Sequence, residues 1–320
     1  METARKMFPK LKQPSVSSVL KAHLALFVVG IFYAINYIVA KGIMPTYIGP
    51  SGFIFYRVFG ATILFWIVHR FISKEKIKRE DYPRFIQAAL FGVAMNQLFF
   101  FNGLNLTSPI NASVIMTSNP VLVLLASAVI LKERITPFKI AGISLGLIGS
   151  LMLIVLPVIL GLSQIEWKSG NPLGDGMILI NALSYGVYLV TVKPLMAKYE
   201  AMTVIKWVFT FGCVMVFPFG YDQALAVDWS AMPTDVLFGV AYVIICVTFL
   251  VYFLNVYAMK SLSPSIVSAY IYLQPVLAGS MSIFLGMEKL HWIKVLSAAL
   301  IFSGVYLVSF RKSKKLPTEA

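Results

Sequence analysis

Two apolar stretches of the chain carry polar and aromatic residues at helical spacing. The first has them at i, i+3 and i+4, namely Tyr33, Asn36 and Tyr37. The second has them at i, i+3, i+4 and i+7, namely Asn181, Ser184, Tyr185 and Tyr188. Residues so spaced share one helix face, where phenol, amide and hydroxyl groups can bind a small amphipathic molecule. The same pattern is also typical of a seam in which Asn and Tyr join packed helices.

A lone arginine, Arg57, lies in a third apolar stretch. An arginine within a membrane segment is a candidate substrate contact, although its long side chain can also extend to the membrane surface. For Lys206, in a later apolar stretch, we expect such an extension to the surface. Weaker candidates for lining a cavity lie in other apolar stretches: Asn96, Gln97, Asn119, Tyr252, Tyr272 and Gln274.

The sequence gives no sign of catalysis. It contains no phosphate-binding glycine loop, no spaced metal ligands and no Gly-x-Ser-x-Gly motif, so we expect no enzyme activity, no cofactor and no metal ion. The 13 acidic residues fall in tails, loops or the ends of apolar stretches. A buried acid for proton coupling is therefore not expected, and Asp175 is the deepest candidate. Cys213 and Cys246 fall inside apolar stretches and predict free thiols.

The elements that position these residues are predicted to be membrane-spanning helices. The chain of 320 residues is 59% hydrophobic and 12% charged, whereas soluble domains have about 25% charged residues. Segments of about 20 apolar residues, enough to cross a bilayer as a helix, recur throughout. We therefore predict an all-α polytopic membrane protein with ten spanning helices near 22–40, 50–71, 83–104, 108–131, 137–160, 174–194, 202–221, 235–258, 263–286 and 290–310.

The placement of the 27 basic residues predicts the orientation of these helices. Most lie in alternate connections and in the tails, in clusters at 5–12, 70–84, 132–139, 193–198 and 311–315. The other connections carry only Lys41, Lys168, Lys289 and Lys294. Because cytoplasmic loops are enriched in Lys and Arg, both termini are predicted to be cytoplasmic, in the cytoplasmic membrane. The net charge of +14 is thus a topological signal, and nucleic acid is not an expected partner.

The chain also contains an internal repeat. Adding 155 to each position places 109–149 on 264–304, with Pro120 on Pro275, Glu133 on Glu288 and Gly149 on Gly304. A linker at 161–173 separates the two predicted halves, 22–160 and 174–310, from each other, and tails at 1–21 and 311–320 flank them. Since each half has five spans, the second must be inverted in the membrane. Inverted repeats are typical of secondary transporters that bind substrate where the halves meet.

The repeated segments, "NPVLVLLASAVILKERITPFKIAGISLGLIGSLML" and "QPVLAGSMSIFLGMEKLHWIKVLSAALIFSGVYLV", resemble the EamA repeat of the drug/metabolite transporter superfamily. The pattern shared with that family is a Pro, an apolar span, a Glu and a Gly-containing span, here with Pro120 and Glu133, then Pro275 and Glu288. The resemblance implies ten helices and transport of small metabolites. Glu133, just before the helix start at Thr136-Pro137, has either a structural role or a role in coupling or gating, and the same alternatives hold for Glu288.

These observations predict a permease that moves small metabolites, such as amino acids or related amphipathic compounds, by alternating access in the direction of export. An alternative is an exchanger of anionic sugar-nucleotide or phosphate compounds, with Arg57 and Lys206 as anion clamps. Another is a membrane receptor or scaffold that transports nothing. The expected partners are a small-molecule substrate and the lipid bilayer, with the chain a monomer or homodimer.

Overall fold

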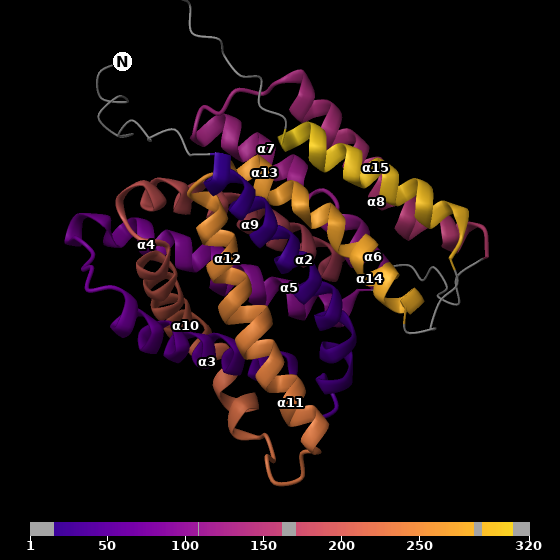
Figure 1. Cartoon of the computed structure of the whole chain (residues 1–320). Helices are drawn as coiled ribbons and strands as arrows, with labels where there is room; N and C mark the ends of the chain where they lie inside the picture. The colour runs from indigo at the N-terminus through magenta and orange to yellow at the C-terminus, as the bar shows by residue number, and fades with distance from the viewer. Residues whose placement is uncertain (1–15, 108, 162–170, 285–289, 310–320) are drawn as a thin grey trace, which may run out of the picture.

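The computed structural model describes residues 16–107, 109–161, 171–284 and 290–309, in which every regular element is a helix (Figure 1). The elements of the first half are α2 (Val16–Ile43), α3 (Pro50–Ile72), η1 (Arg79–Asp81), α4 (Tyr82–Ala89), η2 (Leu90–Ala94), α5 (Met95–Leu106), α6 (Pro109–Met116), α7 (Asn119–Ile130) and α8 (Pro137–Ile159). Those of the second half are α9 (Pro172–Lys198), α10 (Ala201–Leu225), α11 (Thr234–Tyr242), η3 (Val243–Leu250), α12 (Val251–Met259), α13 (Pro264–Ala269), η4 (Tyr270–Tyr272), α14 (Leu273–Phe284) and α15 (Trp292–Ser309).

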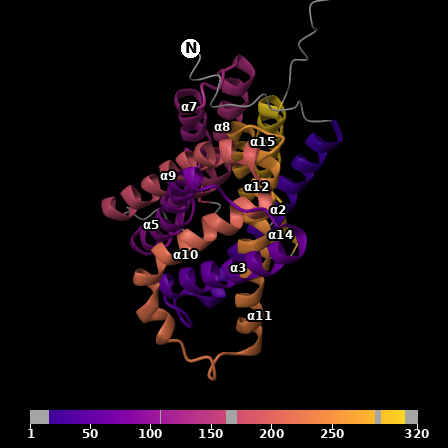
Figure 2. The same cartoon turned by 90° about the vertical axis from the view of Figure 1, so that its left-hand side faces the viewer.

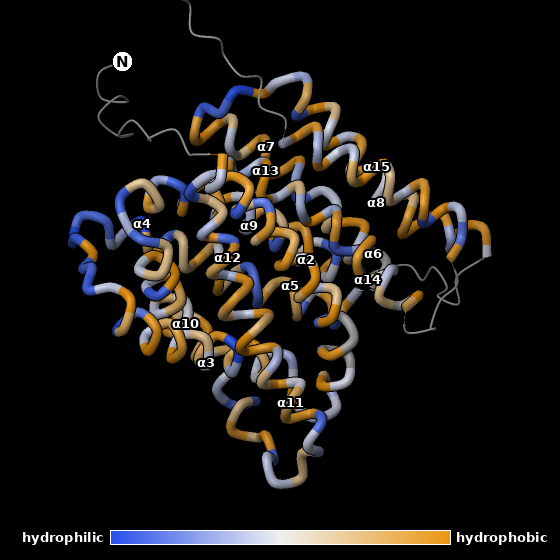
Figure 3. The backbone as a smooth tube through the Cα atoms, in the orientation of Figure 1, coloured by the Kyte–Doolittle hydropathy of each residue, from blue (hydrophilic) through white to orange (hydrophobic). Residues whose placement is uncertain are grey.

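The membrane-spanning helices predicted from composition are present. Nine helices in the described part of the chain are long and apolar enough to cross a membrane. The tenth predicted span, 263–286, consists of three consecutive short pieces, α13, η4 and α14, of which the last is described to Phe284. The most hydrophilic backbone lies in connections such as those between α3 and α4 and between α7 and α8 (Figure 3). The prediction of an all-α polytopic membrane protein is confirmed.

Proline and capping side chains determine where several of these helices begin. Pro137 and Pro172 occupy the first positions of α8 and α9, where the missing N–H costs no hydrogen bond. The residues before them cap the helices: Thr136 Oγ1 accepts a bond from the backbone of Lys139 at 3.3 Å, and Asn171 Oδ1 one from Leu173 at 2.9 Å. The predicted helix start at Thr136-Pro137 is confirmed.

The first helices of the two halves, α2 and α9, run in opposite directions. His23, near the start of α2, is hydrogen-bonded to Tyr270 at 2.7 Å, and Lys193, near the end of α9, donates to the carbonyl of Leu262 at 2.6 Å. The start of one helix and the end of the other therefore lie beside the same part of the chain. Helix α2 packs against α12 and α14, and α9 packs against α5 and α7, so each first helix contacts the third and fourth spans of the opposite half.

Two further pairs of equivalent helices, α3 with α10 and α8 with α15, lie side by side (Figures 1 and 2). The contacts between α8 and α15 follow the repeat offset of 155. A Cβ added to Gly142 would lie 2.6 Å from the Gly304 carbonyl oxygen, and one added to Gly149 would lie 3.0 Å from that of Ser297. Ser297 occupies the position in the second repeat that Gly142 occupies in the first, and Gly304 is equivalent to Gly149 in the same way. This reciprocity is what an approximate twofold axis between the halves requires.

The third span of each half contains a stretch of π-helix, η2 in the first and η3 in the second. A π-helical stretch widens the helix locally and redirects the side chains that follow it, and such stretches are frequent at functional sites. In η3, the hydroxyl of Thr248 donates to the carbonyl of Val243 at 2.8 Å. In η2, Gly92 lies against the ring of Tyr188, where an added Cβ would be 2.2 Å from Cδ2.

Candidate functional site

Arg57 is buried between the two halves. Its side chain is 6% exposed, its Nε–H donates to Thr248 Oγ1 in η3 at 3.1 Å, and its guanidinium lies 5.7 Å from the ring centre of Phe53 and 5.3 Å from that of Phe101. The side chain thus points into the protein and does not extend to the membrane surface. Among the described residues no carboxylate forms an ion pair with it. A buried cation without a counter-ion is suited to an anionic group of a ligand.

Tyrosines from three helices form a cluster beside this cation. Tyr33 of α2 and Tyr252 of α12 both lie within electrostatic reach of Arg57, and Tyr185 and Tyr188 of α9 lie within reach of Tyr252. The ring centres of Tyr185 and Tyr188 are 6.1 Å apart. The structure therefore brings together five residues that the sequence singled out separately. Phenol groups in such a cluster can donate hydrogen bonds to a carboxylate while their rings contact an apolar substrate.

Gln97 and Tyr252 contact each other across the centre of the protein. Gln97 Nε2 donates to the hydroxyl of Tyr252 at 3.2 Å, and that hydroxyl donates to the carbonyl of Gly92 in η2 at 3.3 Å. The two residues are separated by 155 positions, the repeat offset. Two residues at equivalent positions of the repeats can touch each other only close to the axis that relates the two halves. This pair therefore marks the position of the axis beside the candidate site.

Several buried oxygen atoms near these residues have no hydrogen-bond partner within the described structure. They are Asn36 Oδ1, Gln97 Oε1, Asn181 Oδ1 and the hydroxyl of Tyr188. An unpaired buried acceptor costs free energy, about 1–3 kcal/mol, unless water or a ligand supplies a donor. Amide oxygens of this kind can accept bonds from an ammonium group. Together with Arg57 they suit a molecule that carries both an anionic and a donor group.

Of the other residues predicted from the sequence, some form hydrogen bonds within or between helices, and some lie outside the described part of the chain. The amide of Asn181 donates to the backbone oxygen of Asn96 at 2.5 Å, and Ser184 donates to the carbonyl of Asn181 within its own helix, so both also join or stabilise helices. Pro120 and Pro275 lie in the first turns of α7 and α14, directly after interruptions of the fourth span of each half. The side chain of Tyr37 and the whole of Glu288 lie outside the described residues.

The expectation that Lys206 extends to the surface is corrected by the structure. The residue is 4% exposed, and its ammonium lies 3.2 Å from Nδ1 of His69 and 4.3 Å from the ring centre of Trp66. His69 is twelve residues beyond Arg57 on α3, about 18 Å along a helix. The charges of Arg57 and Lys206 are therefore too far apart to clamp one small anion.

A small cavity adjoins the tyrosines. It has a volume of about 20 Å³ and is lined by residues that include Tyr33, Tyr185, Asn255 and Gln274. Such a cavity holds about one water molecule, whereas ligand pockets usually measure roughly 300–1,000 Å³. The structure is therefore closed at this point, and a metabolite could enter only if the surrounding helices moved apart.

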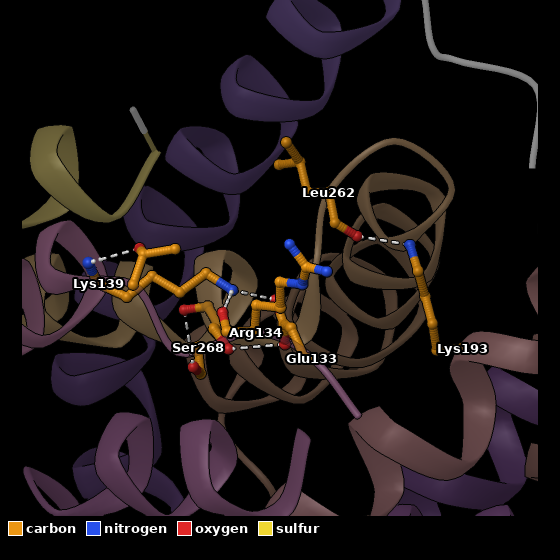
Figure 4. Close-up of polar contacts among 8 residues, drawn as sticks. Glu133, Arg134, Lys139, Lys193, Leu262 and Ser268 are labelled. Atoms are coloured by element: carbon orange, nitrogen blue, oxygen red, sulfur yellow. Dashed lines mark hydrogen bonds and ion pairs between the residues drawn. The ribbon is translucent and has the colours of Figure 1, made fainter. Parts of the chain in front are cut away.

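Polar contacts join the two halves on one side of this cavity. Ser265 of α13 donates to Glu133 Oε2 at 3.0 Å, and the ammonium of Lys139 donates to the other carboxylate oxygen (Figure 4). In the same region Lys193 of α9 reaches the carbonyl of Leu262. Glu133 thus binds both its own half and the opposite one, a geometry compatible with either of its two predicted roles.

The opposite end of the bundle has a polar contact of its own. Thr107, at the end of α5, donates to Asp175 Oδ1 in the first turn of α9 at 2.5 Å. This bond again joins the first half of the chain to the second. Contacts between the halves therefore lie at both ends of the bundle.

Sequence reasoning missed Thr248 and the two π-helical stretches. A threonine in an apolar span is common and gives no signal by itself. π-helices have no sequence signature in a single chain, so neither the partner of Arg57 nor the redirection of Tyr252 could have been predicted from residue types. The described residues contain no group of three His, Cys, Asp or Glu side chains that could hold a metal ion.

Comparisons with known proteins relate the chain to a family of transporters and to a solved structure. The model of the EamA-like transporter family matches residues 20–155 and 172–310. An uncharacterized transporter of Archaeoglobus fulgidus is 25% identical over 294 residues, covering 91% of this chain and 98% of that protein. A WAT1-related protein of Arabidopsis thaliana is 25% identical over 319 residues, covering 92% and 86%. A crystal structure with 18% identity shares the fold, with a TM-score of 0.71 over 89% of this chain and 95% of the other.

Proposed function

The chain belongs to the EamA-like transporter family, and from this premise we propose that it is a secondary transporter that exports small amphipathic metabolites, amino acids or related compounds, by alternating access. Membership of the family, with relatives named as transporters, makes it a membrane transporter. The substrate class, the direction and the mechanism are our proposal.

The observation that carries the substrate class is the unpaired cation at Arg57. Its guanidinium is buried, uses one donor on Thr248 and has further donors directed at no described carboxylate. A substrate carboxylate would supply the missing charge, and the phenol of Tyr33 would donate to the same group. The free amide oxygens of Asn36 and Asn181 would accept bonds from an ammonium. The aromatic rings would contact the apolar part of the substrate.

Alternating access is supported by the arrangement of the contacts between the halves. The cavity beside Tyr33 and Tyr185 is closed, and the halves are joined at one end by Glu133 with Ser265 and at the other by Thr107 with Asp175. Opening one contact at a time would expose the site to one side of the membrane only. In this proposal Glu133 has the gating role.

Three earlier expectations complete the proposal. The basic clusters place both termini in the cytoplasm and the protein in the cytoplasmic membrane. The repeat boundaries are 22–160 and 174–310, with the linker between them. The protein acts as a monomer or homodimer. The alternative of a sugar-nucleotide or phosphate exchanger loses support, because Lys206 and Arg57 cannot bind one small anion together.

The test is a substrate screen with the purified protein in liposomes. Vesicles loaded with one unlabelled compound are assayed for uptake of its labelled form, for amino acids, their methyl esters, their decarboxylated amines and nucleotide sugars. We expect exchange of one or more free amino acids or similar carboxylates, and none of the matching esters or amines. Exchange of amines and esters at equal rates would refute the role of Arg57, and exchange of nucleotide sugars alone would refute the substrate class.

A further inference from the structure

A groove lies between the ends of α3 and α10, far from the candidate transport site. It has a volume of about 910 Å³ and is open to the surface. The last turns of α3 and the segment that follows contribute Trp66, Arg70 and Lys74, while α10 contributes Lys206 and Trp207. The groove is thus formed where two membrane helices emerge beside a connection rich in basic residues.

Lys206 forms the deep end of this groove and lacks a carboxylate partner among the described residues. Its ammonium contacts both nitrogens of the His69 ring, at 3.2 and 3.4 Å, and lies 4.3 and 5.3 Å from the ring centres of Trp66 and Trp207. The rings stabilise the cation but do not neutralise it. A charge held in this way favours an anion in the adjoining space.

The mouth of the groove adds more positive charge. Arg70, Lys74 and Lys76 line it and are exposed. The acidic residue lining it, Glu75, interacts electrostatically with Lys206 and accepts a bond from the backbone N–H of Glu200 at 2.9 Å. The lining therefore has an excess of positive charge even with Lys206 left out. Clusters of Lys and Arg beside membrane helices attract anionic lipid headgroups, at about 1 kcal/mol, or a factor of about five, per residue.

One wall of the groove is apolar and continues along the outside of α3. Trp66 is 44% exposed and Ile67 49% exposed, and Ile63 and Phe59, one and two turns earlier, are also exposed. In a bilayer this surface faces lipid chains. Tryptophan and tyrosine gather at the boundary between the lipid chains and the headgroups, and Trp66, Trp207 and Tyr82 occupy such a position here. An occupant must therefore be anionic at one end and apolar at the other.

We propose that this groove binds an anionic phospholipid, whose phosphate lies near Lys206 and Arg70 and whose acyl chains lie along α3 past Trp66. A soluble phosphate compound would match the charges but leave the apolar wall exposed. A zwitterionic phospholipid would match the wall but would bring its own ammonium toward three basic side chains. The anionic phospholipid satisfies both surfaces. Because α3 and α10 are partners across the axis, the lipid would clamp equivalent helices of the two halves.

The test is lipid binding to the purified, delipidated protein, followed by native mass spectrometry. Phosphatidylglycerol is compared with phosphatidylcholine of identical chains and with glycerol 3-phosphate. We expect one phosphatidylglycerol to be retained in preference to phosphatidylcholine, a higher melting temperature with it, and no effect of glycerol 3-phosphate. Stabilisation by glycerol 3-phosphate equal to that by phosphatidylglycerol would show a free-anion site and overturn the lipid proposal.

Three variants locate the site. Lys206→Met should weaken phosphatidylglycerol binding about tenfold or more, as expected for a charge-assisted hydrogen bond. If that variant does not fold, Lys74→Gln/Lys76→Gln at exposed positions should weaken binding several-fold. Lys260→Gln, an exposed lysine after α12, is the matched control and should leave binding unchanged. Equal loss in the control, or undiminished lipid preference in the groove variants, would refute the assignment.

Discussion

Replacing Arg57 by Gln removes the charge at the centre of the candidate site while keeping an amide donor. In the transport proposal the guanidinium binds a substrate carboxylate by a charge-assisted hydrogen bond, worth roughly 1.5–3 kcal/mol. The variant should therefore bind the substrate about 10 to 100 times more weakly. Arg57→Lys keeps the charge but loses the planar fork, so we expect a smaller loss.

The stability of the Gln variant should change little, because two effects oppose each other. The substitution weakens the bond to Thr248 and removes the contacts with the rings of Phe53 and Phe101. It also removes an isolated cation from a membrane helix, which relieves roughly 2.5–3.5 kcal/mol on insertion scales. A loss of affinity with an unchanged melting temperature would thus indicate a binding role, and a packing role predicts the reverse.

The assay is isothermal titration of the purified variants with the substrate found in the liposome screen. Arg79→Gln, at an exposed arginine of η1 outside both proposed binding sites, is the control for general effects of charge. Thr248→Val should reduce affinity less than Arg57→Gln, and the double variant should be no worse than Arg57→Gln alone, because Thr248 acts through Arg57. Normal affinity in Arg57→Gln would refute the proposed carboxylate site.

Three other predictions concern gating, packing and orientation. Glu133→Gln should weaken the contact with Ser265 and speed substrate exchange or change its sidedness, measured in oriented liposomes; unchanged kinetics would leave Glu133 a structural role only. Gly304→Ala should lower the melting temperature by several degrees, since its Cβ would meet backbone atoms of α8 at 2.6 Å, whereas Gly176→Ala, with open space around it, should not. Single cysteines at Lys260 and at a residue of the 226–233 connection, in a chain without native cysteines, should react with an impermeant thiol reagent from opposite sides, the first from the cytoplasm; labelling from one side would refute the proposed topology.

Features that depend on composition or on strict repetition were predictable from the sequence. Apolar segments long enough to cross a bilayer predicted the helices. Prolines, glutamates and glycines at a constant offset predicted the repeat, because these residue types are rare enough in apolar spans for their coincidence to be informative. The halves also had to meet, which brought Tyr33 and Tyr185 to one cavity.

Features that depend on the direction of a side chain were not predictable. The sequence predicted that Lys206 extends to the membrane surface, but its ammonium group is buried against His69, Trp66 and Trp207. Two of these residues, Trp66 and His69, are far from Lys206 in the sequence. Likewise Thr248, the hydrogen-bond partner of Arg57, is 191 positions away in the sequence. It lies in a π-helical stretch, which no residue type predicts.

The contact between Gln97 and Tyr252 has a consequence for the resting state of the transporter. In the proposed alternating access, exchanging the conformations of the two halves would convert an inward-facing protein into an outward-facing one, and a contact on the axis would be carried into itself. Because it joins the same two residues in both states, this contact would contribute little to the difference in free energy between them. The Glu133–Ser265 bond differs, because the residue equivalent to Ser265 in the first repeat is Ile110, which has no hydroxyl. In this proposal, the places where the two copies have diverged would therefore determine which side of the membrane the empty carrier faces.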